Sequence, residues 1–127
     1  MTQEAKAPNM ETVLQALRCL RAPIQRGEYD LHGLVMDCLR SQGIPCEHEV
    51  RLAPRCRIDL MCGDVGIEIK RGKPERARLM PQLQRYAACE RVASLILVCE
   101  RSVDLPHSLS DKPVRALCLN RLWGIAL

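Results

Sequence analysis

The stretch that decides the fold reads RIDLMCGDVGIEIKRG and covers residues 57–72. In it, two runs of alternating apolar residues flank Gly63-Asp64, and this pattern is typical of a β-hairpin with a two-residue turn. Such a turn fixes the register, which predicts three cross-strand pairs: Cys62 with Val65, Leu60 with Ile67, and Ile58 with Ile69. Because all three pairs are apolar, we expect the hairpin to lay one hydrophobic face on a core.

The opposite face of this hairpin is predicted to carry charge. The same register sets Asp59 directly across from Glu68, with Lys70 two residues further along on the same side. Opposed residues have Cβ atoms roughly 4.5–5.5 Å apart, and like charges there are destabilising. A cation or a shared proton would relieve the repulsion. Lys70 would give a salt-bridged sheet face, whereas Mg²⁺, which proteins hold through one or two carboxylates, would give a metal site. The sequence leaves both interpretations open.

The segments before the hairpin predict two helices and a strand. Helical spacing predicts a first helix over residues 10–21. A second helix, which ends at Gly43, is indicated by a stripe of apolar residues at i, i+3, i+4, i+7 and i+8. These residues are Leu31, Leu34, Val35, Cys38 and Leu39. Alternation over residues 46–52 indicates a strand, and Pro54 follows it in a turn.

The segments after the hairpin predict a helix and two strands. A helical pattern covers residues 75–89, in which Pro81 must either begin a helix or kink one. The apolar run 94–99 is expected to form a strand buried on both faces, and a last strand is expected near 114–119. The predicted order is therefore α-α-β-β-β-α-β-β. We expect a loose tail over residues 1–9 and a single α/β domain over residues 10–127.

Composition narrows the possible functions. The chain has 127 residues, of which 47% are hydrophobic, so it is long enough to bury a core without disulfides or metal. Phe is absent, which argues against binding nucleic acid by base stacking. Its eight cysteines include no Cys-x-x-Cys pair and fall mostly on apolar positions. Packing in a reducing compartment explains them best, with a zinc or iron–sulfur site as the alternative. We therefore expect a cytoplasmic protein; no segment predicts a signal peptide or a membrane span.

Basic residues are concentrated after the hairpin. Seven of them lie between Lys70 and Arg91, against only two acids, Glu75 and Glu90. A basic cluster beside two carboxylates suits a phosphate-bearing polymer, because it attracts the ligand and fixes its register. The alternative is a solvated helix face.

The motifs together resemble those of the PD-(D/E)xK nuclease superfamily. RID supplies Asp59 as the first acid, and IEIK supplies Glu68-Ile69-Lys70 as the Glu-x-Lys. QLQRY places Gln82 and Tyr86 at i, i+4, similar to the Gln-x-x-x-Tyr motif of the branch that contains RecB-type and lambda-type exonucleases. The resemblance covers about residues 26–100. It implies a restriction-endonuclease-like α/β core, with a mixed central sheet (an antiparallel hairpin plus a buried parallel strand) flanked by helices.

The resemblance also implies roles for individual residues. Asp59, Glu68 and the Ile69 carbonyl would bind Mg²⁺ or Mn²⁺, and Lys70 would act on the attacking water or the transition state. Glu28 would assist the metal site, with His32 as its substitute. Gln82 and Tyr86 would support the metal-side groups or a phosphate oxygen, although Tyr86 also fits a packed core tyrosine.

The expected substrate is DNA, bound through its phosphate backbone with little sequence readout. The backbone contacts would come from Arg71, Lys73, Arg76, Arg78 and Arg85. The expected function is therefore a magnesium-dependent deoxyribonuclease, and a homo-oligomer is among the expected partners. The alternative is a catalytically inactive module of the same fold that binds nucleic acid or protein.

Overall fold

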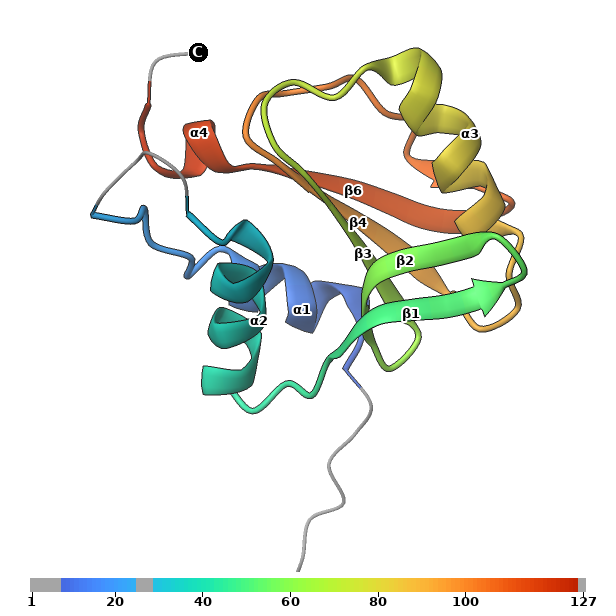
Figure 1. The fold of residues 1–127 in the computed structure, drawn as a ribbon, viewed down its shortest axis with the longest axis horizontal. Coiled ribbons are helices and arrows are strands. Elements are labelled where there is room, and N and C mark those ends of the chain that lie inside the picture. Colours follow the sequence, from blue (N-terminus) through green and yellow to red (C-terminus); the bar gives the residue numbers. More distant parts are fainter. Residues whose placement is uncertain (1–7, 25–28, 126–127) are drawn as a thin grey trace, which may run out of the picture.

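The computed structural model describes residues 8–24 and 29–125 and shows a mixed sheet between two helical layers (Figure 1). Most of the predicted tail, residues 1–7, lies outside the described residues. So does Glu28, the residue expected to assist the metal site.

Two helices precede the sheet, and each begins after an N-cap residue whose side chain accepts a hydrogen bond from the first turn. Helix α1, Met10–Leu17, begins after Asn9, whose Oδ1 accepts a hydrogen bond of 2.9 Å from the Thr12 N–H. Helix α2, Leu31–Ser41, begins after Asp30, whose Oδ1 accepts a bond of 2.9 Å from the Gly33 N–H. These caps satisfy main-chain donors that the first turn leaves unpaired. Both predicted helices are confirmed, although the first ends at Leu17 rather than at residue 21.

The sheet has six strands in the order β1-β2-β3-β4-β6-β5. Their bounds are β1 Glu47–Ala53, β2 Cys56–Cys62, β3 Val65–Lys70, β4 Ser94–Cys99, β5 Ser108–Leu109 and β6 Lys112–Cys118. Strands β1, β2 and β3 form an antiparallel meander, whereas β3, β4 and β6 run parallel. The α/β class and the mixed sheet are thus confirmed. The two-residue strand β5 and the terminal helix α4, Leu119–Leu122, had no counterpart in the prediction.

The hairpin register is confirmed near the turn and wrong further from it. Leu60 pairs with Ile67 and Cys62 with Val65, as the two-residue turn requires. The predicted pair of Ile58 with Ile69 does not form, because β2–β3 pairing ends at Leu60 and Ile67. Ile58 packs in the core cluster that contains α3 residues, while Ile69 packs in the cluster beside α1 and α2. The alternation of β2 side chains between the two faces of the sheet is therefore interrupted at Asp59: Ile58 faces α3, whereas Leu60 faces α1 and α2.

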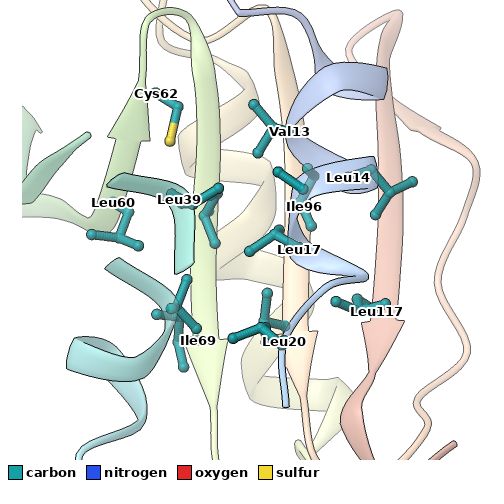
Figure 2. Packing of buried hydrophobic residues seen from close by; sticks show 14 of the residues in the cluster. Val13, Leu14, Leu17, Leu20, Leu39, Leu60, Cys62, Ile69, Ile96 and Leu117 are labelled. Atoms are coloured by element: carbon teal, nitrogen blue, oxygen red, sulfur yellow. The ribbon is translucent and has the colours of Figure 1, made fainter. Parts of the chain in front are cut away.

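Two apolar clusters cover the two faces of the sheet. The first joins α1 and α2 to the strands, and Figure 2 shows Val13, Leu17 and Leu39 directed at Ile96 and Ile69. The second lies under α3, Arg76–Ala87, which is the crossover between the parallel strands β3 and β4. Every residue of β4 is buried, as predicted for a strand covered on both faces.

Helix α3 settles the role of Pro81. The helix runs from Arg76 to Ala87, so it does not begin at Pro81, which lies inside it with its side chain exposed. None of the helices in the described residues has the length and apolar content needed to cross a bilayer.

Candidate functional site: a buried carboxylate pair

The candidate site lies where β2 and β3 separate. Beyond the Leu60–Ile67 pair, side chains take over bonds that a regular ladder would give to main-chain groups. The Ile69 N–H donates to Asp59 Oδ2 at 2.8 Å, and the Asp59 N–H donates to Glu68 Oε1 at 3.3 Å. Each acid therefore binds the backbone of the opposite strand. This exchange explains both the end of the pairing and the close approach of the two carboxylates.

Glu68 is the buried member of the pair. It is 2% exposed, whereas the Asp59 side chain is 24% exposed. Burial first, and then the negative charge of Asp59, raise the pKa of Glu68 to about 7. Lys70 opposes this effect, because its Nζ lies 3.2 Å from Glu68 Oε2. The structure thus brings Asp59, Glu68 and Lys70 together, as the sequence predicted, with Lys70 already paired to the buried acid.

Tyr86 and Gln82 support the site from α3. The fully buried Tyr86 hydroxyl donates to the Arg57 carbonyl at 2.8 Å and accepts a bond of 2.9 Å from Gln82 Nε2. Arg57 lies two residues before Asp59, so this bond anchors β2 next to the carboxylates. Burial and the nearby Glu68 raise the pKa of Tyr86 well above its ordinary value. Tyr86 is therefore a packed tyrosine that also contacts the site, which combines the two interpretations that the sequence left open.

Two histidines join the site from outside the predicted motif. His32, on α2, places Nε2 4.0 Å from Asp59 Oδ2. Its Nδ1 lies 3.2 Å from Nε2 of His48 on β1, and the two rings meet edge to face. Sequence reasoning named His32 only as a substitute and assigned His48 no partner. The available signal was that His48 lies in the strand beside β2, which the β-meander places close to Asp59.

The basic residues assigned to a phosphate backbone differ in their partners. The Arg71 guanidinium stacks 4.3 Å from the Tyr29 ring centroid and also donates to the Tyr29 carbonyl. Arg76 Nε donates to the Asp104 carbonyl at 3.0 Å, and Arg78 Nε lies 3.3 Å from Glu75 Oε2. Lys73 and Arg85 are exposed.

A cavity of about 210 Å³ lies beside the site. Lys70, Arg78 and Gln82 contribute to its lining. One side of the candidate site therefore opens between β3 and the first half of α3.

The donor set is compatible with a hard divalent cation but does not amount to a complete protein cage. Within residues 8–24 and 29–125, no three His, Cys, Asp or Glu side chains are gathered closely enough to hold a metal ion. Asp59 and Glu68 supply two carboxylates, and Mg²⁺ is usually held by one or two carboxylates while it keeps several waters. Because Glu68 is buried beside another acid, a cation there would stabilise its ionised form. The ion pair with Lys70 does the same to a smaller extent.

In comparisons with known proteins, no protein-family model, curated protein or solved structure matches the chain, so they assign it to no family.

Proposed function

We propose that this chain is a metal-dependent nuclease of the PD-(D/E)xK type that hydrolyses DNA phosphodiester bonds. The observation that carries the proposal is the pairing of half-buried Asp59 with buried Glu68, with Lys70 on Glu68, at the point where β2 and β3 separate. A buried acid whose pKa is raised by burial and by a second acid is typical of functional sites. The mixed sheet, with α3 crossing between parallel β3 and β4, supports the restriction-endonuclease-like core.

Asp59 and Glu68 would hold Mg²⁺ or Mn²⁺, with the Ile69 carbonyl as a further ligand. Such a cation supplies polarisation of the scissile phosphate and a lowered pKa of water. His32 would take the supporting position first assigned to Glu28, since its Nε2 faces Asp59. It can do so as an acceptor when its Nδ1 carries the proton and donates to His48.

Lys70 would act on the phosphate side. Its side chain is 35% exposed, so the ammonium group reaches both Glu68 and the cavity beside α3. With a cation held by Glu68, the Lys70 ammonium group would stabilise negative charge that develops on the phosphate oxygens. Tyr86 and Gln82 would keep β2 in place through the Arg57 carbonyl.

A second candidate function is a catalytically inactive module of the same fold that binds nucleic acid or protein. The specific observation in its favour is that both carboxylates already have partners within the protein. Lys70 pairs with Glu68, and the Ile69 N–H occupies Asp59 Oδ2. A salt-bridged sheet face of this kind needs no cation.

The two functions are separated by incubating the purified protein with supercoiled plasmid and linear DNA in Mg²⁺, Mn²⁺ or EDTA. We expect cleavage that needs the metal and is lost in Asp59→Asn, Glu68→Gln and Lys70→Ala. Asp64→Asn is the matched control, because Asp64 is an exposed acid in the same hairpin. Cleavage that survives in Glu68→Gln would contradict the site assignment. A wild type that binds DNA and never cuts it would favour the inactive module.

A further inference from the structure

A second pair of reactive side chains lies at the carboxyl end of the parallel strands, the end at which β3 carries Lys70. Cys99 ends β4 and Cys118 ends β6, and the two are in-register partners of neighbouring parallel strands. Partners in that position direct their side chains to the same face of the sheet. Adjacent strands are roughly 4.7–4.9 Å apart. This spacing falls within the Cα separation of about 4.4–6.8 Å that disulfides need.

Both thiols are directed across the gap between their strands. Cys99 Sγ lies 3.8 Å from the carbonyl of Leu117 on β6, and Cys118 Sγ lies 3.3 Å from the carbonyl of Glu100, which follows β4. Each thiol therefore contacts the backbone next to the other cysteine. All eight cysteines are free in this structure, so the pair is present as two thiols.

The pair differs in exposure. Cys99 is fully buried, and burial together with the nearby Cys118 raises its pKa to about 12. Cys118 is half-buried. Both residues line a cavity of about 560 Å³, to which Arg18, Ser102 and Arg121 also contribute. A small polar oxidant can therefore enter this cavity and reach the more exposed thiol first.

We propose that Cys99 and Cys118 form a redox-active dithiol that hydrogen peroxide converts to a disulfide. The Cys118 thiol loses its proton, the thiolate attacks one peroxide oxygen and the O–O bond breaks. Cys118 sulfenic acid forms, and the leaving hydroxide takes up the proton that the thiol lost, which gives one water. The Cys99 sulfur then attacks the sulfenic sulfur, an S–S bond forms, and the hydroxyl leaves with the Cys99 proton as a second water. Two thiols are oxidised by two electrons and one peroxide is reduced to two waters.

A thiophilic metal is a poorer occupant of the same place. Such ions are held in structural protein sites by about four ligands, whereas no group of three His, Cys, Asp or Glu is gathered in the part of the chain that the structure describes.

Oxidation at this pair would reach the candidate nuclease site through Glu100. The Glu100 carboxylate accepts bonds from the Gly72 N–H at 2.6 Å and from the Tyr29 hydroxyl at 3.0 Å, and Gly72 lies two residues beyond Lys70. A disulfide removes the Cys118 thiol that contacts the Glu100 carbonyl.

The test is to treat the folded, fully reduced chain with hydrogen peroxide, alkylate the remaining thiols in denaturant and digest with trypsin under non-reducing conditions. Cys99 and Cys118 then lie in separate peptides, residues 92–101 and 116–121. We expect these two peptides to be recovered as one linked species, which dithiothreitol separates. Loss of two of the eight thiols should accompany the linkage.

Cysteine-to-serine variants show which thiols form the disulfide. Cys118→Ser should leave Cys99 alkylated after peroxide, whereas Cys19→Ser, in an exposed cysteine, should still yield the linked peptides. Far-UV circular dichroism confirms that each variant is folded. The thiols of Cys56 and Cys89 also contact each other. Recovery of Cys118 as sulfinic acid without linkage, or of Cys56 linked to Cys89 in place of the Cys99–Cys118 pair, would overturn the proposal. Neither result depends on whether the chain cleaves DNA.

Discussion

Glu68 couples the stability of the protein to pH. Its pKa is raised from 4.5 to about 7, so its neutral form is the one the folded protein prefers. The stabilisation is present in full below pH 4.5 and is lost as the pH rises through 7. At about 1.4 kcal/mol per pKa unit, the loss amounts to at most about 3–4 kcal/mol. In EDTA, the free energy of unfolding of the wild type should therefore fall between pH 5 and pH 8 by more than that of Glu68→Gln.

Urea denaturation at the two pH values measures this difference, and the other titrating groups largely cancel between the two proteins. An equal fall in both would show that Lys70 neutralises Glu68 completely. Adding Mg²⁺ at pH 8 should raise the stability of the wild type and leave that of Glu68→Gln nearly unchanged, since a ligand stabilises the state that binds it. A response of the variant as large as that of the wild type would place the cation elsewhere.

Tyr86 is the residue whose hydroxyl joins α3 to β2. Tyr86→Phe keeps the packed ring but leaves the Arg57 carbonyl and the Gln82 amide without their partner. A buried polar group that loses its hydrogen bond costs about 1–3 kcal/mol, so we expect a loss of stability in that range. Chemical denaturation of Tyr86→Phe, Gln82→Ala and the double variant checks this. If the bonds are coupled, the double variant should lose less than the sum of the two single losses.

At the residue scale, the sequence predicted the members of the candidate site better than their contacts. Alternation and the turn placed Asp59, Glu68 and Lys70 together. They did not predict that the two carboxylates would bind main-chain N–H groups, because strand rules describe backbone pairing alone. The contact between His32 and His48 joins residues far apart in sequence, and only the packing of α2 beside β1 and β2 creates it.

At the element scale, periodicity predicted the long elements and missed the short ones. Strand β4 and helix α2 carry enough apolar positions to define a period, whereas β5 has two residues and α4 has four. The end of α1 was also missed, since Leu20 continues the helical spacing and is buried although it lies beyond the helix. A buried position thus gives the same pattern inside a helix and just after it.

Helix α3 carries a removable defect at Pro81. Proline lacks the N–H that would donate to the carbonyl four residues earlier, and its ring crowds that carbonyl. Because Pro81 is exposed, Pro81→Ala should restore the main-chain hydrogen bond within α3 without disturbing the core. We expect a gain of about 1–3 kcal/mol, visible as a higher thermal midpoint. Gln84→Ala, also exposed on α3, is the control and should shift the midpoint little. A lower midpoint in Pro81→Ala would mean that α3 needs the altered geometry.

At the scale of the whole molecule, the two faces of the sheet differ in the residues that cover them. The face under α1 and α2 is an apolar layer, whereas the α3 face contains Glu68, Tyr86 and, at its edge, the basic residues. The sequence predicted an apolar and a charged face for the hairpin, but it placed Ile58 on the face of Ile69, whereas Ile58 packs on the α3 side. It did not show that α3 places Arg78 beside Lys70 around one cavity, because that depends on how the crossover packs.

This arrangement makes a quantitative prediction for DNA binding. Arg78 and Arg85 are seven residues apart on α3, so they lie on one side of the helix, and both are exposed. Each phosphate contact contributes about 0.9 to the slope of log K against log salt, so the variant with Arg78→Gln and Arg85→Gln should lose about 2 from that slope. Fluorescence anisotropy with duplex DNA in EDTA measures it. Arg91→Gln is the control, since Arg91 lies outside α3 and pairs with Glu47 at 2.7 Å. An unchanged slope in the double variant would show that this side of α3 is only a solvated helix face.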